Sequence, residues 1–168
     1  MVLEMDYLKN GQLRYEWNYK DGKEHVASVG YSIGDFAQGG VIFWLDETKK
    51  HGLVCPIEDQ GSAAWLNTHD IVSDSMNHSF YGKRFRDWRV PTKSELNRMY
   101  KNKVNIDATA VLNGGSTFVN NYYWSSSESW GDDGTYFLGQ WGQSFKDGYQ
   151  DDDYYKWVKF NVRAVRNF

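Results

Sequence analysis

The stretch that decides the fold is residues 87–96, with the sequence DWRVPTKSEL. Thr92 and Glu95 follow Pro91 with the spacing of a capping box, in which each residue satisfies a backbone N–H at the start of a helix. The apolar residues that come next share one helical face: Leu96, Met99 and Tyr100. The stretch therefore predicts a rigid extended segment that leads into an amphipathic helix.

Two side chains of this stretch have structural interpretations. Trp88 is predicted to anchor the core, and Arg89 to act as a fork-shaped donor to a buried acid or to carbonyl groups. The arginines near the C-terminus, Arg163 and Arg166, would brace the same junction. The alternative is that Arg89 contacts a ligand.

Strand patterns precede and follow this helix. Gly39-Gly40 marks a tight backbone passage into the apolar run 41–45, and residues 51–57 would pair with that run through a turn at 48–50. Residues 62–86 favour helical segments. Later strands are expected at 122–127, 135–145 and 157–167, the last with apolar and polar residues alternating. The predicted class is α+β: two helices beside a small, mostly antiparallel, twisted sheet with long loops.

The N-terminal residues form a unit of their own. Residues 7–23 read as a β-hairpin, because apolar and polar residues alternate between two turn dipeptides, Asn10-Gly11 and Asp21-Gly22. This segment resembles a single MORN-like repeat, a unit that cannot bury both of its faces alone. We therefore expect an N-terminal segment over residues 1–29 and a main domain over residues 30–168.

Charge and cysteine content exclude several classes of partner. The net charge is −3, which gives no electrostatic basis for binding nucleic acid or an anionic membrane. Cys55 is the single cysteine, so no intrachain disulfide can form, and its apolar surroundings indicate a buried, inert thiol. We find no signal peptide and no apolar run long enough to cross a bilayer. A signal already removed is the alternative, and the compartment stays open.

The sequence does not show the motifs that would carry enzymatic chemistry. The four histidines have no metal-site spacing, Ser125-Ser126-Ser127 is no nucleophile elbow, and residues 113–116 read as a turn and not as a phosphate loop. Calcium binding is an alternative, since Asp132-Asp133 or the run 151–153 would offer oxygen ligands, although without the spacing of a calcium loop. We predict no enzymatic activity and no cofactor.

The stretch 130–157 is rich in residues that bind ligands. Tyrosine and tryptophan give a large contact area at low entropic cost, and aspartate accepts hydrogen bonds from hydroxyl-rich or basic ligands. The candidate ligand-binding residues are Trp130, Asp132, Asp133, Tyr136, Trp141, Asp147, Tyr149, Gln150, Asp151, Asp152, Asp153, Tyr154 and Tyr155. The structural alternative is that the acids only solvate a loop and that Trp141 and Trp157 pack in the core, which we favour for these two tryptophans.

Three blocks, at residues 87–96, 123–128 (YWSSSE) and 162–166 (VRAVR), resemble the Lcl C-terminal-domain family in this order. The resemblance covers about residues 30–168. It implies a C-type-lectin-like fold and a non-enzymatic adhesin or receptor-binding domain at a cell surface, in the extracellular space or on a virion. The ligand would be a glycan or a protein receptor, bound through the 130–157 loop. Some members are variable proteins of diversity-generating systems, which is a further expectation.

Two other functions compete with this one. The chain would be a structural part of a surface or virion assembly if the strand at 13–19 offered a free edge for docking. An enzyme of the formylglycine-generating type shares the broad fold, but such proteins act through a cysteine pair late in the chain. Here the only cysteine is early in the chain.

Overall fold

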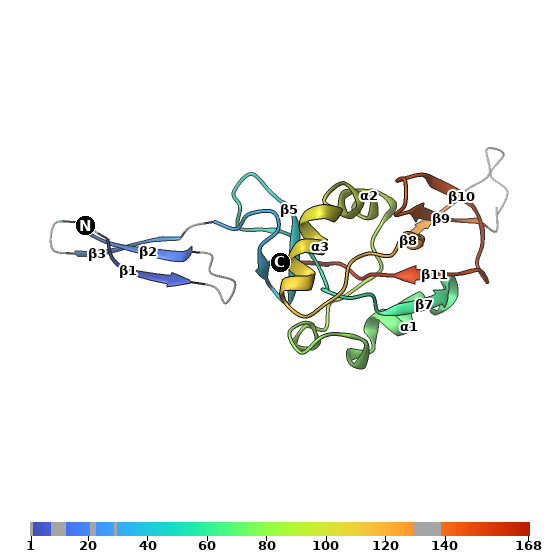
Figure 1. The fold of residues 1–168 in the computed structure, drawn as a ribbon, viewed down its shortest axis with the longest axis horizontal. Helices are drawn as coiled ribbons and strands as arrows, with labels where there is room; N and C mark the ends of the chain where they lie inside the picture. Colours follow the sequence, from blue (N-terminus) through green and yellow to red (C-terminus); the bar gives the residue numbers. More distant parts are fainter. Residues whose placement is uncertain (1, 8–12, 21–22, 29, 130–138) are drawn as a thin grey trace.

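The computed structural model describes residues 2–7, 13–20, 23–28, 30–129 and 139–168 (Figure 1). Its N-terminal strands form a three-stranded antiparallel sheet in the order β1-β2-β3. Their bounds are Val2–Tyr7 for β1, Leu13–Lys20 for β2 and Lys23–Ser28 for β3. The predicted hairpin is confirmed as the β2–β3 pair, but β2 lies between two neighbours. The condition set for the structural-assembly alternative, a free edge at residues 13–19, is therefore not met. The resemblance to a MORN-like repeat stays a prediction, and the two turn dipeptides lie outside the described residues.

The described residues from 30 onward form two sheets where one was predicted. A four-stranded sheet has the order β12-β6-β5-β4, and a five-stranded sheet has the order β10-β9-β8-β11-β7. All pairs are antiparallel except β8 with β11. The strands are β4 (Phe36–Ala37), β5 (Gly40–Leu45), β6 (Gly52–Cys55), β7 (Gly61–Ala64), β8 (Tyr122–Glu128), β9 (Gly139–Ser144), β10 (Gln150–Tyr155), β11 (Lys159–Val162) and β12 (Arg166–Asn167).

Strands β5, β6 and β8 confirm three predicted strands and the pairing of the first two. Residues 157–167 form two strands, β11 and β12, instead of one, and between them Val165 forms an isolated antiparallel bridge with Arg89. The tight passage at Gly40 is also confirmed. A Cβ atom there would lie 2.0 Å from the carbonyl oxygen of Cys55, so only glycine lets β5 approach β6 this closely.

The described residues contain three α-helices instead of two: α1 (Thr68–Ser73), α2 (Lys93–Lys101) and α3 (Lys103–Leu112). Residues 62–86 are only partly helical, since β7 precedes three 3-10 turns and the short α1. The unpredicted helix is α3, which follows α2 after a break at Asn102. Its β-branched residues lower helix propensity and hide the pattern, although Ile106 and Ala110 are buried four residues apart. The α+β class is confirmed.

The core lies on both faces of β8. Tyr123 packs with residues of β5, α2 and α3, whereas the next residue, Trp124, packs on the opposite face with Phe160 and Val54. Successive side chains of a strand point to opposite faces, so this pair divides the core into two clusters. Helices α2 and α3 cover the first face, and α1 packs beside β7 (Figure 1).

The 87–96 stretch forms the junction that the sequence predicted. The Thr92 hydroxyl accepts a hydrogen bond from the Glu95 backbone N–H, and the Glu95 carboxylate accepts one from the Thr92 backbone N–H at 2.8 Å. Both guanidinium ends of Arg89 donate to Glu95 at 2.7 Å. Burial opposes ionisation of Glu95, but the bonds from Arg89 and Thr92 outweigh it and lower the pKa of this carboxyl group. The junction is thus a charge-assisted clamp at the start of α2.

The other predicted braces have different outcomes. Trp88 is buried as expected, and its Nε1–H donates to the Gly82 carbonyl oxygen at 2.9 Å. Arg166 does brace the junction, since it donates to Asp87 at 2.8 Å. Arg163 does not. It is fully buried elsewhere, where its Nε donates to Asp59 at 2.7 Å and its guanidinium lies 4.0 Å from the ring centre of Phe118.

Replacing Thr92 with alanine should lower the free energy of unfolding by about 1 kcal/mol, the usual effect of losing an N-cap side chain. The check is urea unfolding of the Thr92→Ala variant. Ser94→Ala is the matched control, because Ser94 is exposed, lies two residues after Thr92 and does not cap the helix. The free energy of unfolding of this control should change by no more than about 0.5 kcal/mol. Equal changes in the two variants would contradict the capping role.

Candidate functional site

The described part of the predicted ligand-binding stretch, residues 139–157, is largely a β-hairpin and not an irregular loop. Strands β9 and β10 pair antiparallel through a tight turn, in which the Ser144 N–H donates to the Tyr149 carbonyl oxygen at 2.9 Å. Residues 150–155 were predicted as loop because aspartates dominate them, and aspartate is depleted in strands. Pairing with β9 overrides that preference. Trp130, Asp132, Asp133 and Tyr136 lie outside the described residues.

Two of the candidate residues face inward and hold the hairpin in place. The Gln150 amide donates to the Lys93 carbonyl oxygen at 3.0 Å, which ties β10 to the start of α2. Tyr154 packs against Phe160 and Tyr122, with ring centres 4.9 and 5.1 Å away. Burial and hydrogen bonding with Tyr122 raise the pKa of the Tyr154 phenol. These two residues support the fold of the hairpin.

Two of the three aspartates of β10 accept hydrogen bonds from neighbouring groups. Asp151 accepts hydrogen bonds from the backbone N–H groups of Asp152 and Asp153 at 2.9 and 3.3 Å, where the strand register shifts. Asp152 accepts one from the Ser129 hydroxyl at 2.7 Å. The two bonds to Asp151 lie at the register shift, a β-bulge, and the next aspartate, Asp153, is exposed.

The hairpin turn carries a second exposed acid. Asp147 is exposed and accepts a hydrogen bond from the Tyr149 N–H at 3.2 Å. A hydrogen bond from Ser144 and that from Tyr149 lower the pKa of the Asp147 carboxyl group. Trp141, which we favoured as a core residue, is half-buried with the ammonium of Lys93 over its ring. It belongs to the border between the core and the surface.

Exposed aromatic rings distinguish the far end of the hairpin. Tyr155 and Trp157 are 54% and 65% exposed, and their rings stack in parallel with centres 4.5 Å apart. The prediction that Trp157 packs in the core was wrong. It lies in the turn between β10 and β11, where the Val158 N–H donates to the Tyr155 carbonyl oxygen at 3.0 Å. At the other end of the hairpin, Tyr149 is 59% exposed.

The turn that carries this stacked pair contacts Trp65, which sequence reasoning missed. The Trp65 backbone N–H donates to the Lys156 carbonyl oxygen at 2.8 Å, and the Lys156 ammonium lies 5.1 Å from the centre of the Trp65 ring. Trp65 in turn forms one wall of a pocket of about 540 Å³. The pocket is lined by Trp65, Leu66, Thr68, His69, Arg89, Val90, Thr92 and Ser126. No sequence pattern connects residue 65 with residue 156, because β7 and β11 bring them together only in the fold.

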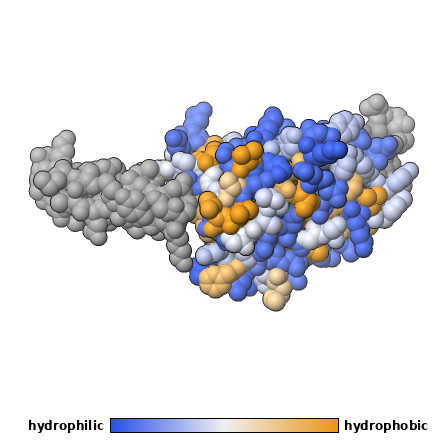
Figure 2. All heavy atoms as spheres, in the orientation of Figure 1, coloured by the Kyte–Doolittle hydropathy of each residue, from blue (hydrophilic) through white to orange (hydrophobic). Residues whose placement is uncertain are grey.

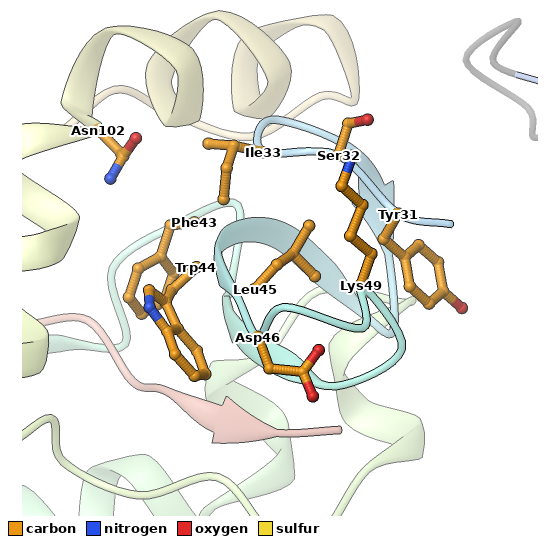
Figure 3. A pocket seen from close by; sticks show the side chains of 9 residues that line it. All are labelled: Tyr31, Ser32, Ile33, Phe43, Trp44, Leu45, Asp46, Lys49 and Asn102. Atoms are coloured by element: carbon orange, nitrogen blue, oxygen red, sulfur yellow. The ribbon is translucent and has the colours of Figure 1, made fainter. Parts of the chain in front are cut away.

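A second pocket, of about 490 Å³, lies where the chain enters the main domain (Figure 3). Figure 2 shows hydrophobic residues gathered toward that end, whereas hydrophilic residues dominate the rest of the visible face. Two polar side chains of this second pocket already have partners: Asp46 accepts a hydrogen bond from the Thr48 hydroxyl, and Asn102 donates one to the Arg98 carbonyl oxygen. None of the predicted ligand-binding residues lines this pocket, so the hairpin end is the stronger candidate. The lining residues are Tyr31, Ser32, Ile33, Phe43, Trp44, Leu45, Asp46, Lys49 and Asn102.

The hairpin end offers stacking and hydrogen bonding.

The single cysteine does not belong to this site. Cys55 is buried, and its burial raises the pKa of the thiol to about 12, which agrees with the predicted inert role. Within the described residues, no three metal-ligating side chains form a group that could hold an ion. No helix in the described part of the chain is long and apolar enough to cross a membrane.

Comparison with known proteins gives one family. The family model described as the Lcl C-terminal domain matches residues 38–166, which is more than three quarters of the chain. No curated protein matches the chain. The matched range contains the 87–96 junction, the β9–β10 hairpin and the stacked Tyr155–Trp157 pair.

Proposed function

The chain belongs to the Lcl C-terminal domain family, and on this premise we propose that it is a non-enzymatic ligand-recognition domain with a C-type-lectin-like fold. Family membership agrees with a surface or ligand-binding domain in general. We assign it to the extracellular space, a cell surface or a virion, as an adhesin or receptor-binding domain. Neither nucleic acid nor membrane insertion nor a cofactor is part of the proposal. The proposed ligand is a glycan, with a protein receptor as the alternative.

The observation that carries the proposal is the exposed stack of Tyr155 on Trp157. Large aromatic side chains usually bury most of their surface, so a parallel pair left more than half exposed is available to a partner. Aromatic faces pack against the C–H faces of sugar rings, and carboxylates such as that of Asp153 accept hydrogen bonds from hydroxyl groups. The buried thiol of the only cysteine supports a non-enzymatic domain.

The experiment is binding of the whole chain to a glycan array, beside a variant with Tyr155→Ala and Trp157→Ala. We expect the double variant to lose at least about tenfold in affinity, because truncating a central aromatic residue of a binding site costs about 2 kcal/mol or more. Its melting temperature should match that of the wild type, since both rings are largely exposed.

Phe80→Ala is the matched control, because Phe80 is 59% exposed but belongs to a different pocket, with Phe36 and Phe85. It should leave glycan binding unchanged. Equal losses in the control and the double variant would contradict the assigned surface. A parallel lane with a calcium chelator tests whether calcium contributes. If the chain binds no glycan on the array, the proposal of a glycan ligand is contradicted, and a protein receptor becomes the proposed ligand.

A further role as a variable protein of a diversity-generating system is part of the same proposal. The support is that exposed Tyr149, Asp153 and Tyr155 lie on a hairpin whose inward residues, Gln150 and Tyr154, hold the fold. Such an arrangement lets surface residues change without loss of the core. A near-copy of this segment beside a reverse transcriptase gene would support the role, and an isolated gene would contradict it.

A further inference from the structure

The pocket walled by Trp65 has the chemistry of a second ligand subsite, and we infer that it binds one neutral sugar unit of an extended oligosaccharide. This inference rests on the proposed function, since it assumes that the Tyr155–Trp157 stack binds the neighbouring part of the same glycan. Its volume of about 540 Å³ lies within the range of small-molecule sites, about 300–1,000 Å³.

The lining combines an aromatic wall with polar groups that have no partner. The hydroxyl of Ser126 and the ring of His69 are exposed and make no hydrogen bond within the described part of the chain. The indole of Trp65 is held rigidly, because its Nε1–H donates to the Ser125 carbonyl oxygen at 2.8 Å. A fixed ring beside unpaired donors and acceptors suits a ligand with an apolar face and hydroxyl groups at its edge.

The charge of the pocket favours a neutral ligand over an anion. Its only arginine, Arg89, is neutralised by two hydrogen bonds of 2.7 Å to Glu95 and donates a third to Asn167 at 2.8 Å. A phosphate or carboxylate would have to compete with Glu95 for the same guanidinium. The remaining polar groups are hydroxyls and one imidazole, which recognise hydroxyl groups without requiring charge.

Three backbone groups beside the pocket are already hydrogen-bonded within the described part of the chain. The Ser126 N–H donates to the Pro91 carbonyl oxygen at 2.8 Å, and the Trp65 N–H donates to the Lys156 carbonyl oxygen at the same distance. The Ser125 carbonyl oxygen accepts the Trp65 indole. A peptide that adds as an extra strand requires such groups to be open. The pairing of these three groups favours recognition by side chains at this point, as for a sugar.

The proposed subsite is connected to the Tyr155–Trp157 stack through Lys156 and Trp65. Lys156 lies between Tyr155 and Trp157 in the sequence, and both its carbonyl oxygen and its ammonium contact Trp65. Trp65 thus separates the exposed stack from the pocket. A ligand that spans both would contact two aromatic platforms at once, so the second sugar unit would bind with the effective concentration of an attached group.

The test uses three neutral series, of glucose, mannose and N-acetylglucosamine, each with one to four units, titrated calorimetrically against the whole chain. For at least one series, affinity should rise about tenfold or more between one and three units. Ser126→Tyr, which fills the pocket from an exposed strand position, and His69→Ala should each remove most of this rise and leave one-unit affinity within about twofold. Ser94→Tyr, at an exposed serine outside the pocket, is the matched control, and its affinity should still rise with the number of sugar units.

The outcomes separate the two claims. A rise with length that survives both Ser126→Tyr and His69→Ala, or no rise in the wild type, would overturn the subsite alone. Binding that survives Tyr155→Ala with Trp157→Ala would overturn the proposed surface. If no series binds the wild type, both the glycan proposal and the subsite fail. Melting temperatures within about 2 °C of the wild type show that the variants are folded.

Discussion

Replacing Asp59 with alanine should lower the free energy of unfolding by about 3 kcal/mol. The Arg163 side chain is fully buried, and among the described residues Asp59 is its only carboxylate partner, with Arg163 Nε 2.7 Å from Asp59 Oδ1. The same carboxylate accepts a hydrogen bond from the buried Tyr123 hydroxyl at 2.8 Å. Removing one partner of a buried pair costs about 3–5 kcal/mol, and the 19% exposure of Asp59 places the loss at the low end.

Urea unfolding of three variants checks this expectation. Asp153→Ala is the matched control, because Asp153 is an exposed aspartate, and its change should stay within about 0.5 kcal/mol. Adding Arg163→Met to Asp59→Ala should recover part of the loss, since an apolar side chain needs no counter-charge. A loss below about 1 kcal/mol for Asp59→Ala, or no recovery in the double variant, would contradict the role of this pair.

Trp124→Ala should cost about 3–5 kcal/mol of stability, whereas Trp157→Ala should cost less than about 1 kcal/mol. Trp124 is completely buried, its ring centre is 4.3 Å from that of Phe160, and its Nε1–H donates to the Ala63 carbonyl oxygen at 3.0 Å. Its removal leaves a large cavity and an unsatisfied carbonyl group. Trp157 is 65% exposed, so truncation removes little except its stacking on Tyr155.

Thermal unfolding followed by calorimetry compares the two tryptophan variants directly. The expected order is a strongly lowered melting temperature for Trp124→Ala and a nearly unchanged one for Trp157→Ala. Similar losses would mean that Trp157 belongs to the core, as the sequence alone had favoured. That result would also remove the exposed stack on which the proposed function depends.

Local chemistry explains what could be predicted from the sequence. The capping box of Thr92 and Glu95 needs only four residues, and the tight passage at Gly40 follows from the Gly39-Gly40 pair beside an apolar run. The partner of Arg89 was predicted as a buried acid or carbonyl groups, and it is the half-buried acid Glu95, which was not named. The three blocks that carried the family resemblance, residues 87–96, 123–128 and 162–166, meet at this junction. Val165 bridges Arg89, and the Ser126 N–H donates to the Pro91 carbonyl oxygen.

Features that depend on long-range pairing could not be predicted. Strand β10 is aspartate-rich and becomes a strand because β9 pairs with it, and Trp157 is exposed because a turn separates β10 from β11. The partner of Arg163, Asp59, is 104 residues away in the chain.

Helix α3 was missed for a local reason, because β-branched residues obscure its helical pattern. Trp65 joins the candidate site only through the pairing of β7 with β11.

The most direct test of the proposed site is a two-dimensional NMR spectrum of the indole N–H groups of the eight tryptophans, recorded with and without neutral trisaccharides of glucose, mannose and N-acetylglucosamine. Assignment by single Trp→Phe replacements identifies each signal. We predict that the Trp157 and Trp65 signals shift on binding. Trp44, which lines the pocket in Figure 3, and buried Trp124 should stay in place. A shift of Trp44 without one of Trp157 would place the ligand at the other end of the domain and contradict the proposal.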